Sequence, residues 1–377
     1  MVIGIDANEA NVTQKVGTGQ YAFELIKHLY ILQDIKKEKI KFILYLKSTP
    51  SDKFPEENNY WEYKVLPGRG FWILTSLMPR LLKSENVDVF FSPNHYLPII
   101  SRVPQVCMIH DLGYLKFSEQ FNLKDYWQLK YWSAISISIS KYIISPSKST
   151  KNDIVRHYKN ASKKVKVIPH GYNKKLFNEN INNLIVRQIK NKYRISENYL
   201  LFLSTLKPSK NIEGLINTFS VISKKYPKYN LVIAGKKGWM YETIFKKVEE
   251  LGLSGKVIFT GYVKEEEKPF LFAGAMAFVL PSFWEGFGMD ILNSMACKTP
   301  VLASNTASIP EVAGKAAIYF DPNKTDSMVN AISKIIEMPV GEYNKLVKLG
   351  QERVKSYSWE KCASKTYEVL KLAGEKN

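Results

Sequence analysis

The sequence predicts an α/β protein with two doubly wound parallel-sheet domains. The chain of 377 residues is too long for one typical domain, and its content of 45% hydrophobic and 13% aromatic residues can fill large cores. Apolar runs of strand length alternate with helical patterns along the chain, which is typical of a doubly wound fold. The clearest unit, residues 277–303, is an apolar run, a glycine-bracketed turn, a helical pattern and a second apolar run. Such units build parallel sheets.

The first predicted strand, Val2–Ile5, is followed by a polar loop and a helix that begins near Gly17 and ends at about Leu32. Gly17 and Gly19 open this helix in a pattern that matches a dinucleotide-binding fingerprint. The context argues against such a site, because a long loop separates the strand from the glycines. In addition, the next predicted strand, Lys41–Leu46, is not followed by the ribose-binding acid. A purely structural glycine turn is the alternative.

Further strands of the first half are predicted at residues 87–91, 105–109, 142–144 and 165–168. His110 comes directly after the second of these, where open α/β sheets place their ligands. We interpret it as a functional residue, with a structural histidine as the alternative, and Asp111 as its orienting neighbour or a turn residue. The segment Phe71–Leu82 is aromatic and apolar, and Pro79 interrupts it. It is either a helix at a membrane surface or a core helix.

The second half restarts the same alternation. Strands are predicted at residues 199–203, 231–234, 257–263, 277–280 and 301–303, with helices from Ile212 to about Tyr226, after Gly288, and from Trp359 to Leu372. The turn Glu285–Gly288 suits an anion, because glycines let the backbone approach a ligand and the following helix offers unpaired N–H groups. Glu285 cannot help to bind a phosphate, so sugar hydroxyls are its expected partners. The alternative is a solvated loop residue.

Three segments together carry a family resemblance: Glu285-Gly-Phe-Gly-x-x-x-Leu-x-x-Met-Ala296, Thr299–Asn305 and Pro310–Gly314. They resemble the C-terminal signature of the family 4 retaining glycosyltransferases. The resemblance implies the GT-B fold, with two Rossmann-like domains facing across a cleft. It places an acceptor domain at residues 1–172, completed by a helix at about 358–377, and a nucleotide-sugar donor domain at 173–357. It also implies a helix, not a strand, for the alternating segment Ser133–Ser140.

The resemblance assigns roles to individual residues. Glu285 would contact the donor sugar, Lys210 would neutralise the diphosphate, and His110 would lie near the donor sugar and acceptor. The remaining donor-binding candidates are Gly17, Thr18, Gly19, Ser209, Gly261, Tyr262, Val263, Gly286, Phe287, Gly288, Met289, Asp290 and Asn293.

The chain departs from the family pattern at three of these positions. Ser209 replaces an arginine, Asp290 replaces a proline, and Asn293 replaces the second glutamate, which contacts the nucleotide ribose. We expect a weakened ribose contact at Asn293, or a contact from Asp290 one helical turn earlier.

The implied function is a retaining, metal-independent glycosyltransferase that moves a hexose from a nucleotide sugar to a hydroxyl of a glycan or lipid-linked acceptor in cell-surface polysaccharide synthesis. GDP-mannose is the favoured donor, because Leu231–Trp239 resembles mannosyltransferase-like members, and a UDP-sugar is the alternative. The sequence has no Asp-x-Asp metal motif, so we expect no cofactor. The rival hypotheses are a nucleotide-sugar 2-epimerase and a non-catalytic nucleotide-sugar-binding protein.

Charge and cysteine content bear on partners and compartment. The net charge of +19 favours an anionic partner such as an acidic membrane surface, although a lysine-rich composition bias would give the same value. No nucleic-acid-binding signature accompanies it. The three cysteines are far apart and form no disulfide or zinc pattern. With no apolar run long enough to span a bilayer, we expect a cytoplasmic protein, either free or peripheral at the inner face of the membrane.

Overall fold

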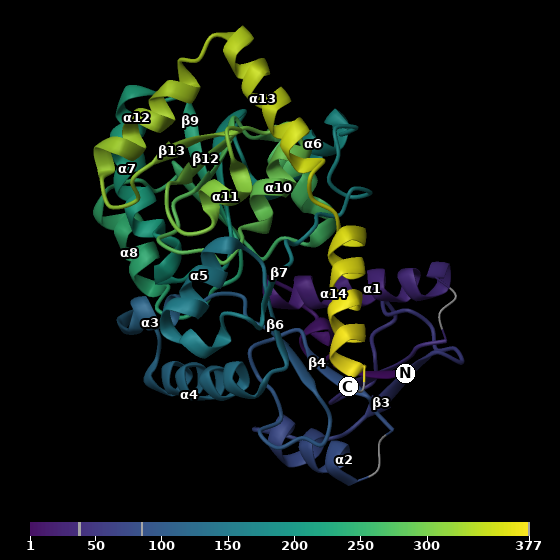
Figure 1. Ribbon diagram of the computed structural model, residues 1–377. Coiled ribbons are helices and arrows are strands. Elements are labelled where there is room, and N and C mark those ends of the chain that lie inside the picture. Colours follow the sequence, from purple (N-terminus) through teal and green to yellow (C-terminus); the bar gives the residue numbers. More distant parts are fainter. Residues whose placement is uncertain (37–38, 84–85, 376–377) are drawn as a thin grey trace. The chain divides into compact units, whose positions relative to one another are not determined.

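The computed structural model describes residues 1–36, 39–83 and 86–375. The chain divides into two compact units, Met1–Gly171 with Ser358–Asn377, and Tyr172–Tyr357. Each unit is a parallel sheet with helices on both faces (Figure 1).

Within the described residues, the first unit contains a seven-stranded sheet in the order β3-β2-β1-β4-β5-β6-β7. Its strands are β1 (Val2–Asp6), β2 (Lys41–Leu46), β3 (Trp61–Val65), β4 (Val89–Ser92), β5 (Gln105–Met108), β6 (Tyr142–Ser145) and β7 (Val165–Val167). Its helices are α1 (Thr18–Lys36), α2 (Met78–Lys83), α3 (Gly113–Lys116), α4 (Leu123–Ile139), α5 (Lys148–His157) and α14 (Trp359–Gly374). The chain order reverses between β1 and β4, so the loops that follow these two strands lie at the switch point of the sheet.

The second unit contains a sheet whose described strands follow the order β10-β9-β8-β11-β12-β13. The strands are β8 (Asn198–Leu203), β9 (Tyr229–Ala234), β10 (Val257–Gly261), β11 (Ala277–Leu280), β12 (Val301–Ser304) and β13 (Ala317–Phe320). The helices are α6 (Asn183–Tyr193), α7 (Ile212–Lys225), α8 (Glu242–Glu250), α9 (Lys268–Gly274), α10 (Met289–Ala296), α11 (Ile309–Ala313), α12 (Thr325–Ile336) and α13 (Val340–Val354). This is the strand order of a Rossmann fold, with its switch point between β8 and β11.

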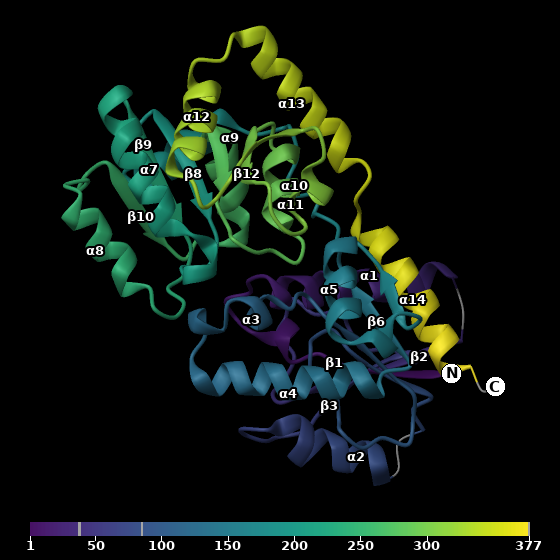
Figure 2. The ribbon, with the colours of Figure 1, turned by 60° about the vertical axis from the view of Figure 1, so that its left-hand side comes forward.

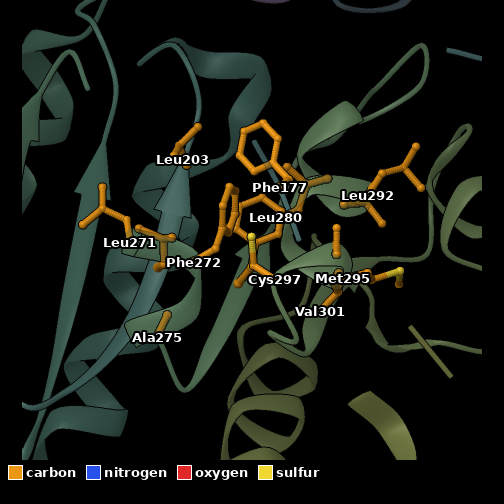
Figure 3. Close-up of a cluster of buried hydrophobic side chains, with 14 of the residues drawn as sticks. Phe177, Leu203, Leu271, Phe272, Ala275, Leu280, Leu292, Met295, Cys297 and Val301 are labelled. Atoms are coloured by element: carbon orange, nitrogen blue, oxygen red, sulfur yellow. The ribbon is translucent and has the colours of Figure 1, made fainter. Parts of the chain in front are cut away.

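Both faces of the second sheet are covered, as the continuous apolar runs of its strands predict. Along β8, Tyr199, Leu201 and Leu203 enter one core, while Leu200 and Phe202 enter the other. Figure 3 shows part of the first core, where Leu203 and Leu280 from the sheet lie among side chains of the α9 and α10 region, such as Phe272 and Leu292. These two packed layers fix the ends of β8 and β11, from which the candidate site residues follow.

The helix expected at Ser133–Ser140 is confirmed, since these residues lie at the end of α4. The alternating apolar and serine residues form a helix and not a strand, because the hydroxyl groups of the buried serines make hydrogen bonds in the helical arrangement. Ser136 Oγ accepts a hydrogen bond from the Leu97 N–H at 3.0 Å, and Ser140 Oγ donates to the Ser136 carbonyl at 2.5 Å.

The segment Phe71–Leu82 forms a π-helical turn at Ile73–Leu77 followed by α2. The wider turn accommodates Pro79, which has no N–H to donate. Trp72, Leu77 and Leu81 are buried in the core of the first unit, so the core-helix alternative is confirmed for this face. Phe71, in contrast, is exposed. In the described residues, no helix combines the length and the apolar character needed to cross a bilayer.

Candidate active site

An ion pair between Lys210 and Glu285 lies at the switch point of the second sheet. Lys210 follows β8 in a 3₁₀ turn, Pro208–Lys210, and Glu285 follows β11. Because β8 and β11 are neighbours, their carboxyl ends bring the two residues together. Lys210 Nζ donates to Glu285 Oε1 at 2.5 Å, and each side chain is only 12% exposed. The two residues that the sequence predicted as catalytic in this unit are therefore in direct contact.

Hydrogen bonds from neighbouring loops hold Glu285 in place. Ser282 Oγ donates to Glu285 Oε1 at 2.7 Å, and Ser308 Oγ donates to the Glu285 carbonyl at 2.8 Å. The Phe283 N–H donates to the Ser209 carbonyl at 3.0 Å and so ties the loop after β11 to the loop after β8. Both side-chain bonds to the carboxylate fall on Oε1, and the lone pairs of Oε2 can accept hydrogen bonds from ligand hydroxyls.

The glycine turn leads into α10 as predicted. Gly288 has a φ of +85°, a conformation that favours glycine, and Met289 begins the helix. Phe287 does not point toward a ligand, because its buried ring packs edge-on against Tyr357 at a centroid distance of 5.7 Å. The ring of Phe287 is thus part of the core, which leaves only the backbone of this predicted donor-binding residue for a ligand contact. Gly286 is buried beside it.

Asp290 and Asn293 form a hydrogen-bonded pair on the first turn of α10. Asn293 Nδ2 donates to Asp290 Oδ1 at 3.0 Å. Burial raises the pKa of Asp290, although Lys268 and the bond from Asn293 act in the opposite direction. The amide of Asn293 therefore orients the carboxylate of Asp290.

Lys268 is a residue that sequence reasoning missed. Its Nζ lies 2.5 Å from Glu265 Oε2, at the start of α9. Burial lowers the pKa of Lys268, but Glu265, Asp290 and Tyr262 outweigh burial and raise it above its usual value. Lys268 therefore connects the donor-binding candidates at the end of β10, Gly261, Tyr262 and the buried Val263, to the first turn of α10. No motif in the sequence marked this lysine, because its partners are set by the fold.

In the first unit, His110 follows β5 and is buried. Its Nε2 lies 3.0 Å from the Pro93 carbonyl, so Nε2 carries the proton and Nδ1 is the acceptor nitrogen. Its backbone N–H donates to His95 Nε2 at 3.0 Å, which places the proton of His95 on Nδ1, 3.3 Å from Ser133 Oγ. His95 is a second residue that sequence reasoning missed, since a lone histidine after β4 carries no signal. Asp111 is a turn residue whose Oδ1 accepts from the Gly113 N–H at 2.8 Å.

Burial keeps these imidazoles neutral. It lowers the pKa of His95 to about 4 and, together with the neighbouring His95, lowers that of His110 to about 3. Burial also holds the pKa of His170 well below its usual value. His110 is therefore suited to accept a hydrogen bond and is a poor proton donor at neutral pH.

The glycine loop after β1 lies close to His110. A Cβ at Gly19 would approach the Glu9 carbonyl oxygen to 2.8 Å, so the close packing of this turn requires glycine. Gly17 has a φ of +45°, and Thr18 begins α1. The Tyr21 N–H donates to the Gly17 carbonyl at 3.0 Å, and the Tyr21 ring meets the His110 ring edge-on at 5.1 Å. The loop after β1 and the residue that follows β5 thus meet beyond the carboxyl ends of the first sheet, which brings the predicted loop and the predicted histidine together.

In the described part of the chain, no group of three or more His, Cys, Asp or Glu side chains could hold a metal ion.

Two Rossmann-like units, each with candidate residues beyond the carboxyl ends of its strands, form the architecture of the GT-B class. Residues 17–176 match the model for glycosyltransferase family 4, and residues 185–353 match the model for glycosyl transferases group 1. The chain belongs to the family 4 glycosyltransferases.

Individual relatives agree with this assignment, and a solved structure shares the fold. The chain is 27% identical over 373 residues to O-antigen chain mannosyltransferase B of Escherichia coli, covering 94% of this chain and 96% of that protein. It is 30% identical over 288 residues to an uncharacterized glycosyltransferase of Methanocaldococcus jannaschii, covering 73% and 71%. The fold is similar to that of Anabaena HepE in complex with UDP-glucose, with a TM-score of 0.74, 17% identity and coverage of 98% and 99%.

Proposed function

We propose that the protein is a retaining glycosyltransferase that transfers a hexose from a nucleotide sugar to a hydroxyl of a glycan or lipid-linked acceptor in cell-surface polysaccharide synthesis. The observation that carries this proposal is the Lys210–Glu285 pair at the switch point of the second sheet. A fixed cation and a fixed carboxylate side by side suit a ligand with an anionic diphosphate next to a polyhydroxylated sugar.

In the proposed reaction, the bond between the anomeric carbon and the diphosphate oxygen breaks, and the electron pair leaves with the nucleoside diphosphate. The acceptor hydroxyl attacks the oxocarbenium-like sugar from the same face and passes its proton to the departing phosphate. Lys210 stabilises the negative charge that grows on the leaving group. Glu285 holds sugar hydroxyls and offsets positive charge on the ring.

The other candidate residues bind and orient. His110, with its acceptor Nδ1, takes a hydrogen bond from a hydroxyl of the reacting sugar or acceptor. The N–H groups at the start of α10 and in the Gly17–Gly19 loop contact the diphosphate, and the Asp290–Asn293 pair accepts from the ribose. Lys210 and these N–H groups supply the positive potential, so the proposal includes no metal or other cofactor.

GDP-mannose is the proposed donor and a UDP-sugar the alternative. The support is the similarity to O-antigen chain mannosyltransferase B over nearly the whole chain, together with a second relative named O-antigen chain mannosyltransferase RfbU, 29% identical over 269 residues. We propose that the protein works on the cytoplasmic side of a membrane that holds its lipid-linked acceptor.

The test is a donor screen followed by product analysis. Nucleoside diphosphate release should be seen with GDP-mannose, and the new linkage should keep the anomeric configuration of the donor when examined by NMR. Glu285→Gln should lose this activity, with Glu311→Gln, on α11 of the same unit, as a matched carboxylate control. An inverted linkage would overturn the retaining mechanism, and isomer formation without acceptor would indicate an epimerase.

A further inference from the structure

Helix α4 exposes an apolar stripe on its outward face. Leu123, Trp127 and Tyr131 are spaced by four residues and therefore lie on one side of the helix. Leu123 is 77% exposed and Tyr131 59%, and the Trp127 and Tyr131 rings stack with an interplanar angle of 12° and a centroid distance of 5.3 Å. Contiguous exposed apolar side chains of this size are unusual in a soluble surface and mark an interaction site. Figure 2 shows α4 running across its unit between α3 and α2.

The face of α4 opposite the stripe anchors the helix to the rest of the first unit. Trp132 Nε1 donates to the Leu97 carbonyl at 2.8 Å, and Ser136 Oγ accepts from the Leu97 N–H. Ile137 is buried in the core of the unit. The buried face thus anchors the helix, while Trp127 stays 43% exposed between the more exposed Leu123 and Tyr131.

Lysines border the stripe. Lys130 Nζ lies 4.8 Å from the Trp127 ring centroid, and Lys124 is exposed on the same helix. The only acid within α4, Asp125, accepts a hydrogen bond from Asn122 Nδ2 at 2.6 Å at the start of the helix.

We propose that this surface, made of Leu123, Trp127 and Tyr131 with Lys124 and Lys130, docks on an anionic lipid surface. Leucine suits the acyl boundary, tryptophan and tyrosine suit the interface, and lysines attract acidic headgroups. A glycan platform would instead combine aromatic rings with carboxylate and amide groups, which bind sugar hydroxyls. The charges here are lysines, so the lipid surface is favoured.

The inference deepens the proposed function, since a lipid-linked acceptor lies at such a surface. The inner face of α4 also supports the candidate histidine, because Ser133 on α4 contacts His95, which accepts from the His110 N–H. One helix thus carries the docking surface and the support of His110 on opposite faces.

The test is co-sedimentation of the whole protein with vesicles, without donor or acceptor. Wild type should bind vesicles made of equal amounts of phosphatidylglycerol and phosphatidylcholine more tightly than vesicles of phosphatidylcholine alone. The triple variant Leu123→Gln, Trp127→Gln, Tyr131→Gln should lose at least about tenfold in partition coefficient, because its apolar contacts are removed. The pair Lys124→Gln, Lys130→Gln should lose a comparable factor at low salt.

Leu184→Gln is the matched control, because Leu184 is 66% exposed on α6 of the other unit. It should bind as wild type, and unchanged thermal unfolding of each variant shows that folding is intact. Vesicle binding that is insensitive to the triple variant, or equal for the two vesicle types, would overturn the proposal. Loss of binding to a soluble acceptor glycan, with vesicle binding retained, would assign the surface to glycan instead. Glu285→Gln should bind vesicles normally, so failure of the catalytic proposal is seen separately.

Discussion

The ammonium of Lys210 lies 2.5 Å from a carboxylate oxygen of Glu285, and Ser282 donates to the same oxygen. The cation and the carboxylate compensate one another where both side chains are largely shielded from water. Removing either one leaves an uncompensated charge, so the two residues are expected to be coupled in both stability and activity.

Glu285→Gln should lower turnover by about 100-fold or more, because a contact made chiefly to the reacting sugar is lost. The affinity for the free nucleoside diphosphate should change little or increase, since Lys210 loses its competing partner. Steady-state kinetics and calorimetric titration of the diphosphate measure the two effects. Unchanged turnover would exclude a catalytic role for Glu285.

Lys210→Ala should weaken binding of the free nucleoside diphosphate by about 1.5–3 kcal/mol, the value of a hydrogen bond to a charged group. Transfer should slow as well. In the double variant Lys210→Ala, Glu285→Gln, the losses in stability should be smaller than the sum of the single losses. If diphosphate binding is unaffected and only stability falls, Lys210 is a structural residue.

Asp290→Ala should weaken nucleotide binding more than Asn293→Ala does. Asp290 is the carboxylate, and Asn293 contributes through the 3.0 Å hydrogen bond that orients it. Asn293→Glu should not tighten binding, because two carboxylates would then lie within one helical turn and repel each other. Titration of the nucleotide against the three variants shows whether Asp290 or Asn293 contacts the ribose. A roughly tenfold gain for Asn293→Glu would instead show that position 293 contacts the ribose directly.

Acid should destabilise the first unit between about pH 6.5 and pH 4. The folded-state pKa values of His95 and His110, about 4 and about 3, lie below the usual 6.5. The unfolded chain therefore binds more protons in this range, and each histidine costs about 1.4 kcal/mol of unfolding free energy per pH unit as the pH falls. Asp6 acts in the opposite direction and offsets part of this loss, because burial raises its pKa to about 6.

The loss of unfolding free energy can be measured for the first unit alone by the hydrogen-exchange protection of β4 and β5 at pH 7.5 and 5.5. The pH dependence should be smaller in His95→Gln, which removes one of the titrating groups. Equal protection at both pH values would show that the histidines titrate normally.

Gly171→Ala should destabilise the protein by about 3 kcal/mol or more, because the new Cβ would lie 2.1 Å from the Trp359 backbone nitrogen. Gly341→Ala is the control, since Gly341 lies in α13 with no atom within 4 Å of the added methyl group. Alanine there should stabilise the helix by up to about 1 kcal/mol. Thermal unfolding of both variants makes the comparison, and equal melting temperatures would refute the predicted clash.

Chelation of divalent ions should leave wild-type activity intact, because Lys210 is proposed to supply the charge opposite the leaving group. Activity is measured with and without EDTA after dialysis. Loss of activity that magnesium restores would show that a metal takes part in the reaction.

The sequence predicted the described strands well except for β3 and β13, because apolar runs and glycine turns are local signals. It was less informative where tertiary packing decides. The alternation at Ser133–Ser140 is typical of a strand, yet buried hydrogen bonds make it helical. Phe287 lies within a ligand-binding motif, yet its ring belongs to the core. The supports of the site, His95 and Lys268, come from separate elements and have no signature in the sequence.

The first unit is assembled from two separate pieces of the chain. Helix α14 completes it, with the Trp359 ring 6.0 Å from that of Tyr21 and Lys141 Nζ donating to the Ala373 carbonyl at 3.1 Å. The second unit is one continuous segment inserted between these pieces. During translation, the segment Tyr172–Tyr357 is therefore synthesised with all of its strands before α14 is. The first unit begins to be synthesised before the second unit, but it can finish folding only after α14 has been made. Until then, the face of α1 that receives α14 is exposed, and exposed surfaces of this kind make folding intermediates prone to aggregation.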